Sequence, residues 1–192
     1  VIFFIVAAIM IIAVTIHEFA HAWLADKLGD PTPRYQDRVT LNPLAHLDPI
    51  GSLAILFLGF GWGKPVQFDP YNLKEPVRDA ALIALAGPVS NIVLAVLMAV
   101  GLRFVQIDWL QVVLSYALFY NVALAVFNLV PIAPLDGSKI LMALLPKRAM
   151  LEYESLMIRY STVILFIVLV PWQGTSFISM LIRPVIDVVV AL

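Results

Sequence analysis

A His-x-x-x-His pair with an acidic residue inside it interrupts an otherwise apolar run at the start of this sequence. From Val1 to Ile16 the only side chain that is not purely apolar is Thr15, and apolar residues resume after His21 and continue to Ala25. A charged residue at the centre of a membrane helix costs about 2.5–3.5 kcal/mol on the insertion scale. Three titratable residues in this setting therefore need a compensating partner, and a bound metal ion is one that fits.

The spacing of His17, Glu18 and His21 favours such an ion. Helical residues four apart share one face, with Cβ atoms about 5–6 Å apart, so both imidazoles can reach one metal. Glu18 lies about 100° around the helix from His17, close enough to polarise a water on that metal. This is the metalloprotease arrangement of two zinc ligands and a general base. The alternatives are a chance pattern or a helix that leaves the bilayer at His17, and the apolar residues up to Ala25 disfavour the second.

Composition sets the class of protein. Hydrophobic residues make up 62% and charged residues 13% of the chain, whereas a soluble domain has about 25% charged residues. The mean hydropathy of +0.97 agrees with a polytopic membrane protein. The net charge of -1 gives no reason to expect nucleic acid as a partner, and the absence of cysteine excludes disulfides and thiolate ligands. Any zinc must therefore be held by nitrogen and oxygen atoms.

The predicted fold is an all-α polytopic membrane protein of about five to six transmembrane or re-entrant helices, with a small β-hairpin-like insertion. We expect one membrane-embedded domain over residues 1–192, with a core at 1–145 and C-terminal helices at 149–192. Gly29 and Pro31 should end the first helix, and a 50–62 segment of about 13 residues is short for the ~20 needed to span. The other predicted helices are 1–28, 80–102, 109–135, 149–170 and 176–192, and the predicted short strands are 38–41 and 64–68.

A catalytic zinc usually has three protein ligands, so one is missing from the pair of histidines. Asp136 is favoured because it follows the uncharged run 109–135 and is flanked by Pro134 and Gly137, which let the backbone turn at membrane depth. An ordinary turn aspartate is the alternative. The other candidates by residue type are Asp26, Asp30, Asp37, His46 and Asp48.

Three separated motifs resemble the site-2 proteases, a family of intramembrane zinc metalloproteases. They are His17-Glu18-x-x-His21, Gly87-Pro88-x-x-Asn91 and Asn128-x-x-Pro131-x-x-Pro134-Leu135-Asp136-Gly137. The resemblance implies one Zn²⁺ per chain bound by His17, His21 and Asp136, with Glu18 activating the water. It also implies that Asn91, and with less support Asn128, holds the substrate carbonyl or its oxyanion. The sequence resembles the compact members, without a PDZ or CBS module.

This resemblance implies an endopeptidase that cuts in or near transmembrane segments of single-pass membrane proteins. The substrate would be unwound and would pair with a strand edge at 38–41 or 64–68. The alternatives are an inactive scaffold, or a transporter or ion-conducting protein in which His17, Glu18 and Asp136 form a proton or metal path. No spanning helix precedes the first motif in this sequence, which leaves open an upstream segment.

The distribution of basic residues predicts an orientation. Most of them fall on one side of the predicted helices and Arg103 on the other, which by the positive-inside rule puts the histidine pair toward the cytoplasm. We expect a multi-pass protein of a prokaryotic cell membrane, in contact with lipid and a transmembrane substrate. His46, a lone loop histidine, is expected to be structural rather than catalytic. The basic residues of the cytoplasmic side are Lys27, Arg34, Arg38, Lys64, Lys74, Arg78, Lys147 and Arg148.

Overall fold

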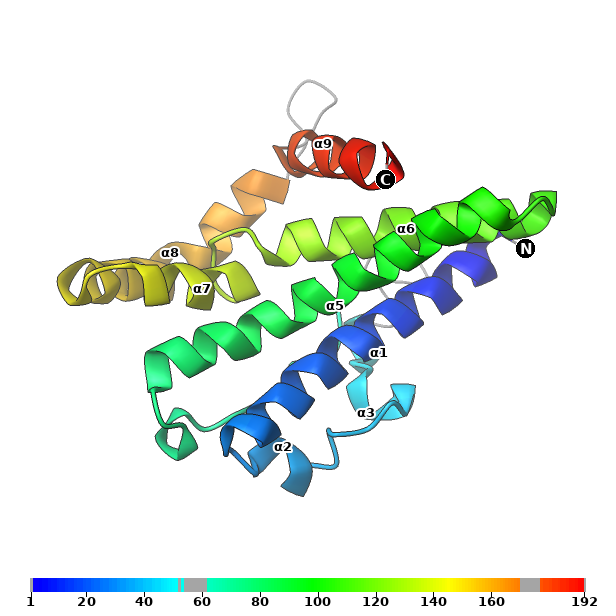
Figure 1. The fold of residues 1–192 in the computed structure, drawn as a ribbon. Helices are drawn as coiled ribbons and strands as arrows, with labels where there is room; N and C mark the ends of the chain where they lie inside the picture. Colours follow the sequence, from blue (N-terminus) through cyan, green and yellow to red (C-terminus); the bar gives the residue numbers. More distant parts are fainter. Residues whose placement is uncertain (1, 52, 54–61, 170–176, 192) are drawn as a thin grey trace.

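The computed structural model describes residues 2–51, 53, 62–169 and 177–191, and this part of the chain is mostly helical (Figure 1). Helices carry the labels of Figure 1. In chain order the elements are α1 (Ile2–Leu28), α2 (Thr32–Tyr35), α3 (Pro43–His46), the 3₁₀-helix η1 (Pro70–Asn72), α5 (Pro76–Phe104), α6 (Asp108–Asn128), α7 (Asp136–Leu144), α8 (Lys147–Leu169) and α9 (Phe177–Ala191).

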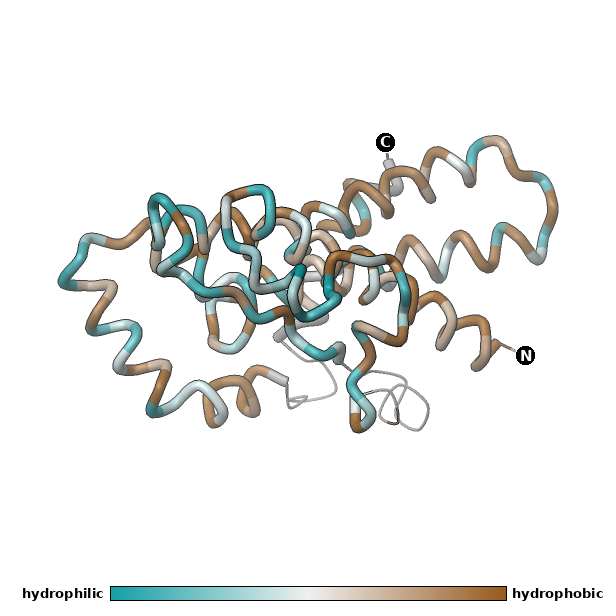
Figure 2. Tube along the Cα trace, turned by 90° about the horizontal axis from the view of Figure 1, so that it is seen from below, coloured by the Kyte–Doolittle hydropathy of each residue, from teal (hydrophilic) through white to brown (hydrophobic). Residues whose placement is uncertain are grey.

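Three of these helices, α1, α5 and α6, are long and apolar enough to cross a membrane. They lie side by side, with α5 packed against both α1 and α6 (Figure 1). Hydrophobic residues dominate along the long helices and hydrophilic residues gather in the loops (Figure 2). The chain is therefore an integral membrane protein, as predicted. The predicted count of five to six transmembrane or re-entrant helices is not confirmed, and most of the 50–62 segment lies outside the described residues.

Helix α1 ends where the sequence predicts. Gly29 has φ +111°, a left-handed conformation that favours glycine at the position after a helix. The carboxylate of Asp30 then accepts hydrogen bonds from Thr32 at the start of α2, from the Asp69 N–H and from the Asn72 amide. This fully buried aspartate therefore joins the end of α1 to the segment that enters η1 and α5.

The predicted 109–135 helix stops at Asn128, because residues 129–135 form a turn that contains two prolines. Proline lacks the N–H that a continuing helix would need. The turn folds back tightly, since a Cβ on Gly137 would lie 2.2 Å from the Leu129 carbonyl oxygen. A glycine is thus required there, and the turn delivers Asp136 to the first position of α7.

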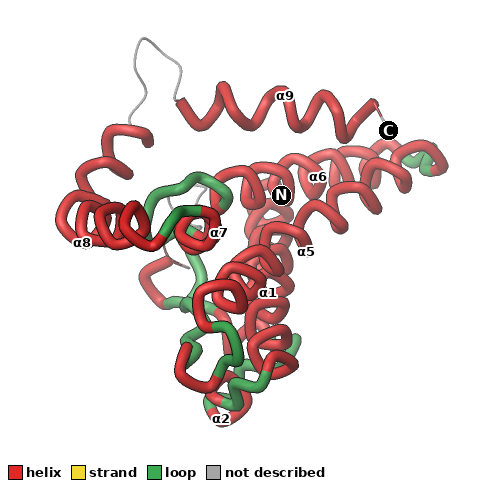
Figure 3. Tube along the Cα trace, turned by 60° about the vertical axis from the view of Figure 1, so that its left-hand side comes forward, coloured by secondary structure: helices red, strands yellow, loops and turns green. Residues whose placement is uncertain are grey.

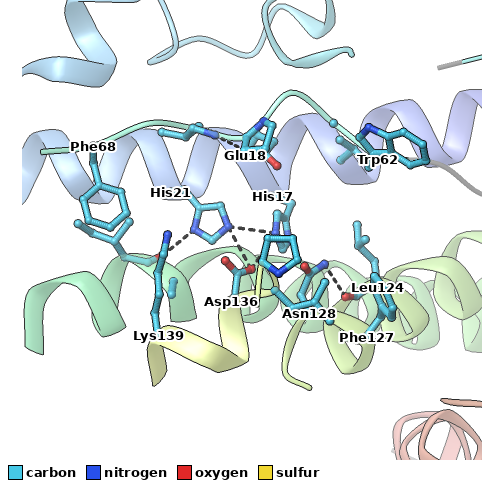
Figure 4. Close-up of a pocket in the computed structure, with 18 residues that line it drawn as sticks. His17, Glu18, His21, Trp62, Phe68, Leu124, Phe127, Asn128, Asp136 and Lys139 are labelled. Atoms are coloured by element: carbon cyan, nitrogen blue, oxygen red, sulfur yellow. Dashed lines mark hydrogen bonds and ion pairs between the residues drawn. The ribbon is translucent and has the colours of Figure 1, made fainter. Parts of the chain in front are cut away.

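The predicted β-hairpin is not present in the described part of the chain, where an isolated antiparallel bridge between Leu47 and Gly63 takes its place. Residues 38–41 form no strand: residues 39–40 are bends and residues 38 and 41 are irregular. The reason is local: Asp37 adopts φ +54°, and the Arg38 N–H donates to the carbonyl of Pro33 in α2, so the chain folds back on α2 here. Residues 64–68 are irregular and cover the histidine-bearing part of α1 (Figure 4).

The C-terminal helices pack on the outside of the core. In Figure 3, α8 lies beside α7 and α9 runs along α6. Val185 and Ile186 of α9 contact a buried α5–α6 cluster that includes Ala95 and Ala99. The small residues Ala95 and Ala99 of α5 let this helix approach α6 closely.

Candidate metal centre

The two histidines of α1 and the aspartate of α7 converge in space (Figure 4). One carboxylate oxygen of Asp136, Oδ2, lies 3.2 Å from His17 Nε2 and 3.3 Å from His21 Nε2. The two Nε2 atoms are 3.0 Å apart. Residues more than 100 positions apart in the sequence are thus brought to one point, as the sequence analysis expected of them.

The outer nitrogen of each imidazole is held by an acceptor. His17 Nδ1 lies 2.6 Å from Asn91 Oδ1, and His21 Nδ1 lies 2.6 Å from the Ile83 carbonyl oxygen. Both partners are on α5. Because each acceptor requires a proton on Nδ1, this assigns the tautomer that leaves the Nε2 lone pair facing the other ligand atoms.

This arrangement fits a zinc ion. Two Nε2 lone pairs and a carboxylate oxygen face one another, and Asp136 Oδ2 is buried without a hydrogen-bond donor. A bound metal cation would satisfy all three of these acceptors at once. Bond lengths of 2.0–2.2 Å to a tetrahedral zinc place ligand atoms about 3.3 Å apart, close to the observed separations. A set of two imidazoles and one carboxylate with no thiolate also leaves one position for water.

Gly87 explains why α5 can come so close to the ligands. A Cβ at this position would lie 2.4 Å from His21 Nε2 and 2.6 Å from His17 Nε2. Only a residue without a side chain allows the backbone of α5 to touch both imidazoles. Gly87 belongs to the second sequence motif, but the spacing of that motif does not indicate this close approach to the histidines.

Glu18 lies in the same cavity as the three ligands, which has a volume of about 250 Å³. Its Oε2 accepts a hydrogen bond of 3.0 Å from the Val66 N–H, and the Arg38 guanidinium is 4.0 Å away. The sequence predicted Arg38 and Val66 as parts of short strands and not as partners of Glu18, because contacts between loops leave no periodic pattern in a sequence. The walls are otherwise mostly apolar, formed among others by Val14, Trp62, Phe68, Ile83, Ala84, Leu124 and Phe127.

The two asparagines of the motifs occupy different places. Asn128 lines the cavity, and its amide donates to the Leu124 carbonyl one turn earlier. Asn91 is 0% exposed and does not line the cavity. Its amide nitrogen donates to Asn121 Oδ1 at 2.9 Å and to the Ala13 carbonyl at 3.3 Å, so both hydrogens are used. This placement favours an orienting role toward His17 over the predicted contact with an oxyanion.

His46 is fully buried and lies outside the cavity lining, and its Nε2 is 2.7 Å from the Thr40 carbonyl oxygen. These contacts agree with the expected structural role.

Lys139 was not predicted as a site residue. It lines the cavity one turn after Asp136, and its Nζ lies 4.6 Å from the centre of the Phe68 ring. Burial lowers the pKa of its ammonium group, and the Asp136 and Glu18 carboxylates oppose that shift.

This chain is similar to a known protein family and to named zinc metalloproteases. The model of peptidase family M50 matches residues 103–170. "Putative zinc metalloprotease YwhC" of Bacillus subtilis is 42% identical over 147 residues, which is 71% of this chain and 67% of that protein. The chain belongs to peptidase family M50, the site-2 protease family.

Other members are similar over the same share of the chain. "Putative zinc metalloprotease Rip2" of Mycolicibacterium smegmatis is 34% identical over 146 residues, and the protein of that name in Mycobacterium tuberculosis is 31% identical. The chain covers 55% of each Rip2 protein. No solved structure matches this M50 chain. Family and relatives together support a zinc metalloprotease, with Zn²⁺ as the metal of the His17–His21–Asp136 group.

Proposed function

We propose that this M50 chain is an intramembrane zinc endopeptidase that hydrolyses peptide bonds in or near transmembrane segments of single-pass membrane proteins. The observation that carries the proposal is the position of the metal group and Glu18 in one apolar-walled cavity, with His17, Glu18 and His21 on α1, a helix apolar enough to span a bilayer. Such walls exclude bulk water and favour contact with an apolar substrate segment.

His17, His21 and Asp136 are the residues that would hold the zinc. When bound there, zinc acts as a Lewis acid and lowers the pKa of a coordinated water to about 7. Glu18 takes a proton from the attacking water and passes it to the leaving amine of the cut peptide bond. Its carboxylate lines the same cavity as the ligands, as this role requires.

The asparagines take separate roles in this proposal. Asn128 faces the cavity and has a second amide hydrogen beyond the one given to Leu124, so it is the donor we assign to the substrate carbonyl and its oxyanion. Asn91 fixes the orientation of His17, and Asn121 in turn fixes Asn91.

The substrate must be locally extended to reach the cavity. We assign its contact to residues 64–68, because Pro65, Val66 and Phe68 form part of the cavity wall. Residues 38–41, the other predicted edge, are bent and do not line the cavity. Proline at Val66 is expected to impair cleavage more than proline at Val39.

The proposed orientation puts the metal group on the cytoplasmic side of a prokaryotic cell membrane. Lys27 at the end of α1 and Arg78 at the start of α5 lie at one end of the long helices, whereas Arg103 lies at the other. The transporter alternative is less favoured, because the acidic and imidazole groups gather at one metal group rather than along a path.

The test is cleavage of a transmembrane peptide by the purified chain in detergent, together with its zinc content. Cleavage that stops with a chelator and returns with added zinc supports the proposal. A zinc-loaded chain that transports metal or protons but leaves every transmembrane peptide intact would refute it.

A further inference from the structure

A buried arginine lies behind the proposed general base. Arg38 is 3% exposed, although it belongs to a loop between two short helices. A buried guanidinium is costly unless it is paired and hydrogen-bonded. The groups around Arg38 therefore indicate the role that offsets the free-energy cost of burying it.

One nitrogen of Arg38, Nη2, serves two partners. It donates a hydrogen bond to the Lys64 carbonyl oxygen, and it lies 4.0 Å from Glu18 Oε2. The same Glu18 oxygen accepts the N–H of Val66, two residues after Lys64. Arg38, the 64–66 backbone and Glu18 thus form a closed ring of contacts.

The backbone of this ring is also held from its other side. The Lys64 N–H donates to the His46 carbonyl at 2.7 Å, and Gly63 forms the bridge to Leu47. A Cβ on Gly63 would lie 2.6 Å from Val14 Cγ1, so the segment passes directly over α1. The position of Val66 N–H, and with it the position of Glu18, therefore depends on how Lys64 is fixed.

We infer that Arg38 is a positioning residue for Glu18: it fixes Lys64 and offers the Glu18 carboxylate a counter-charge, so that the base and the 64–66 backbone are held together. Arg38 does not line the cavity, and the contacts described for it include none of the three metal-ligand side chains. The inference rests on the proposed function for its catalytic consequence, but not for the structural coupling.

Lysine is a useful replacement because it keeps the charge and loses the planar fork. A single ammonium does not reproduce the geometry of a guanidinium toward a carbonyl and a carboxylate. Arg34 in the preceding short helix α2 offers a matched control: it is exposed, and its partner is Asp26 at 2.6 Å rather than Glu18.

The test compares R38M, R38K and R34M in the full chain by zinc content, kcat, KM and hydrogen exchange of the 62–68 amides. Both Arg38 variants should retain zinc. The kcat of R38M should fall by about 10²-fold and that of R38K by less, and KM should change less than kcat in both. Exchange at Val66 should speed up in both, whereas R34M should match the parent chain in every measurement.

Wild-type kcat in R38K with unchanged exchange at Val66 overturns the inference, and so does a loss of zinc that parallels the loss of kcat. If R38M does not fold, R38K decides by the same criteria. Should the parent chain bind zinc without cleaving any peptide, the proposed function fails, while the exchange data still decide whether Arg38 fixes the Glu18 contact.

Discussion

The metal group and the general base are built from different kinds of structure, although they share one cavity. The ligands sit on regular helices, two on α1 and one at the start of α7, and their outer partners are on α5. Glu18 also comes from α1, but its partners, Arg38 and Val66, belong to irregular segments. The ligands are therefore held by helix packing, and the base by loop contacts.

Because the two parts are held by different contacts, zinc binding and the rate of cleavage can be lost separately. A change on the ligand side should alter zinc binding, whereas a change on the base side should alter the rate with zinc in place.

Removing a ligand and removing the base should both abolish cleavage, but only removal of the ligand should abolish zinc binding. D136A takes away a buried ligand oxygen, so the chain should lose zinc and activity together. E18Q should fold and retain zinc but show no cleavage, because the amide cannot accept the proton of water. Zinc content and peptide cleavage are measured on both. Full activity in E18Q would remove the base from this picture.

Gly87→Ala should disrupt the ligand side through contact alone. The added methyl would lie 2.4 Å from His21 Nε2, and the helix backbone of α5 would have to move away. We expect most of the bound zinc to be lost. G101A in the same helix is the control, since its Cβ would meet only Leu114 at an ordinary 3.6 Å. Equal zinc binding in the two variants would contradict the close approach of α5 to the imidazoles.

The two motif asparagines should separate in the same way. N128A should retain zinc and lose about 10²–10³ in kcat, as expected for an oxyanion donor. N91A should weaken zinc binding by about 10–100-fold, as expected when the outer partner of a ligand is removed. Zinc titration and kcat at saturating zinc distinguish them. If N91A binds zinc normally and loses only kcat, the orienting role is wrong.

Asp30→Asn should have the smallest effect on the site, since it acts only by joining the loops on the base side. Burial raises the pKa of Asp30, but hydrogen bonds from Thr32, Asn72 and the Asp69 N–H outweigh it, so the pKa is lowered. The stability contributed by this group is complete above the unfolded-state pKa of about 3.9 and is lost as the pH falls through the lower folded value.

We expect D30N to reduce the free energy of unfolding at neutral pH by about 1.5–3 kcal/mol, the value of hydrogen bonds to a charged group. The difference from the parent chain should shrink in acid. Unfolding at several pH values checks this. A difference that grows as the pH falls would contradict the assigned sign.

The sequence predicted the ligand side better than the base side, for a physical reason. Helical spacing placed His17 and His21 on one face, and the turn residues around Asp136 marked the end of a long apolar run. The positions of Arg38 and Val66 depend on contacts between loops, which have no period to read. The strand prediction at 38–41 rested on β-branched residues, and hydrogen bonding of Arg38 back to α2 overrode it. The orienting contact of Asn91 was missed because residue type alone does not show where an amide points.

Asp136 joins the group from the far side of the 129–135 turn, on a helix that otherwise packs against α5. A metal ion held there would join α1 directly to α7, two helices that otherwise share little contact. Removal of the metal by a chelator should therefore do more than abolish cleavage. It should also separate α7 from α1, whereas the packing of α7 against α5 and of α9 against α6 should remain.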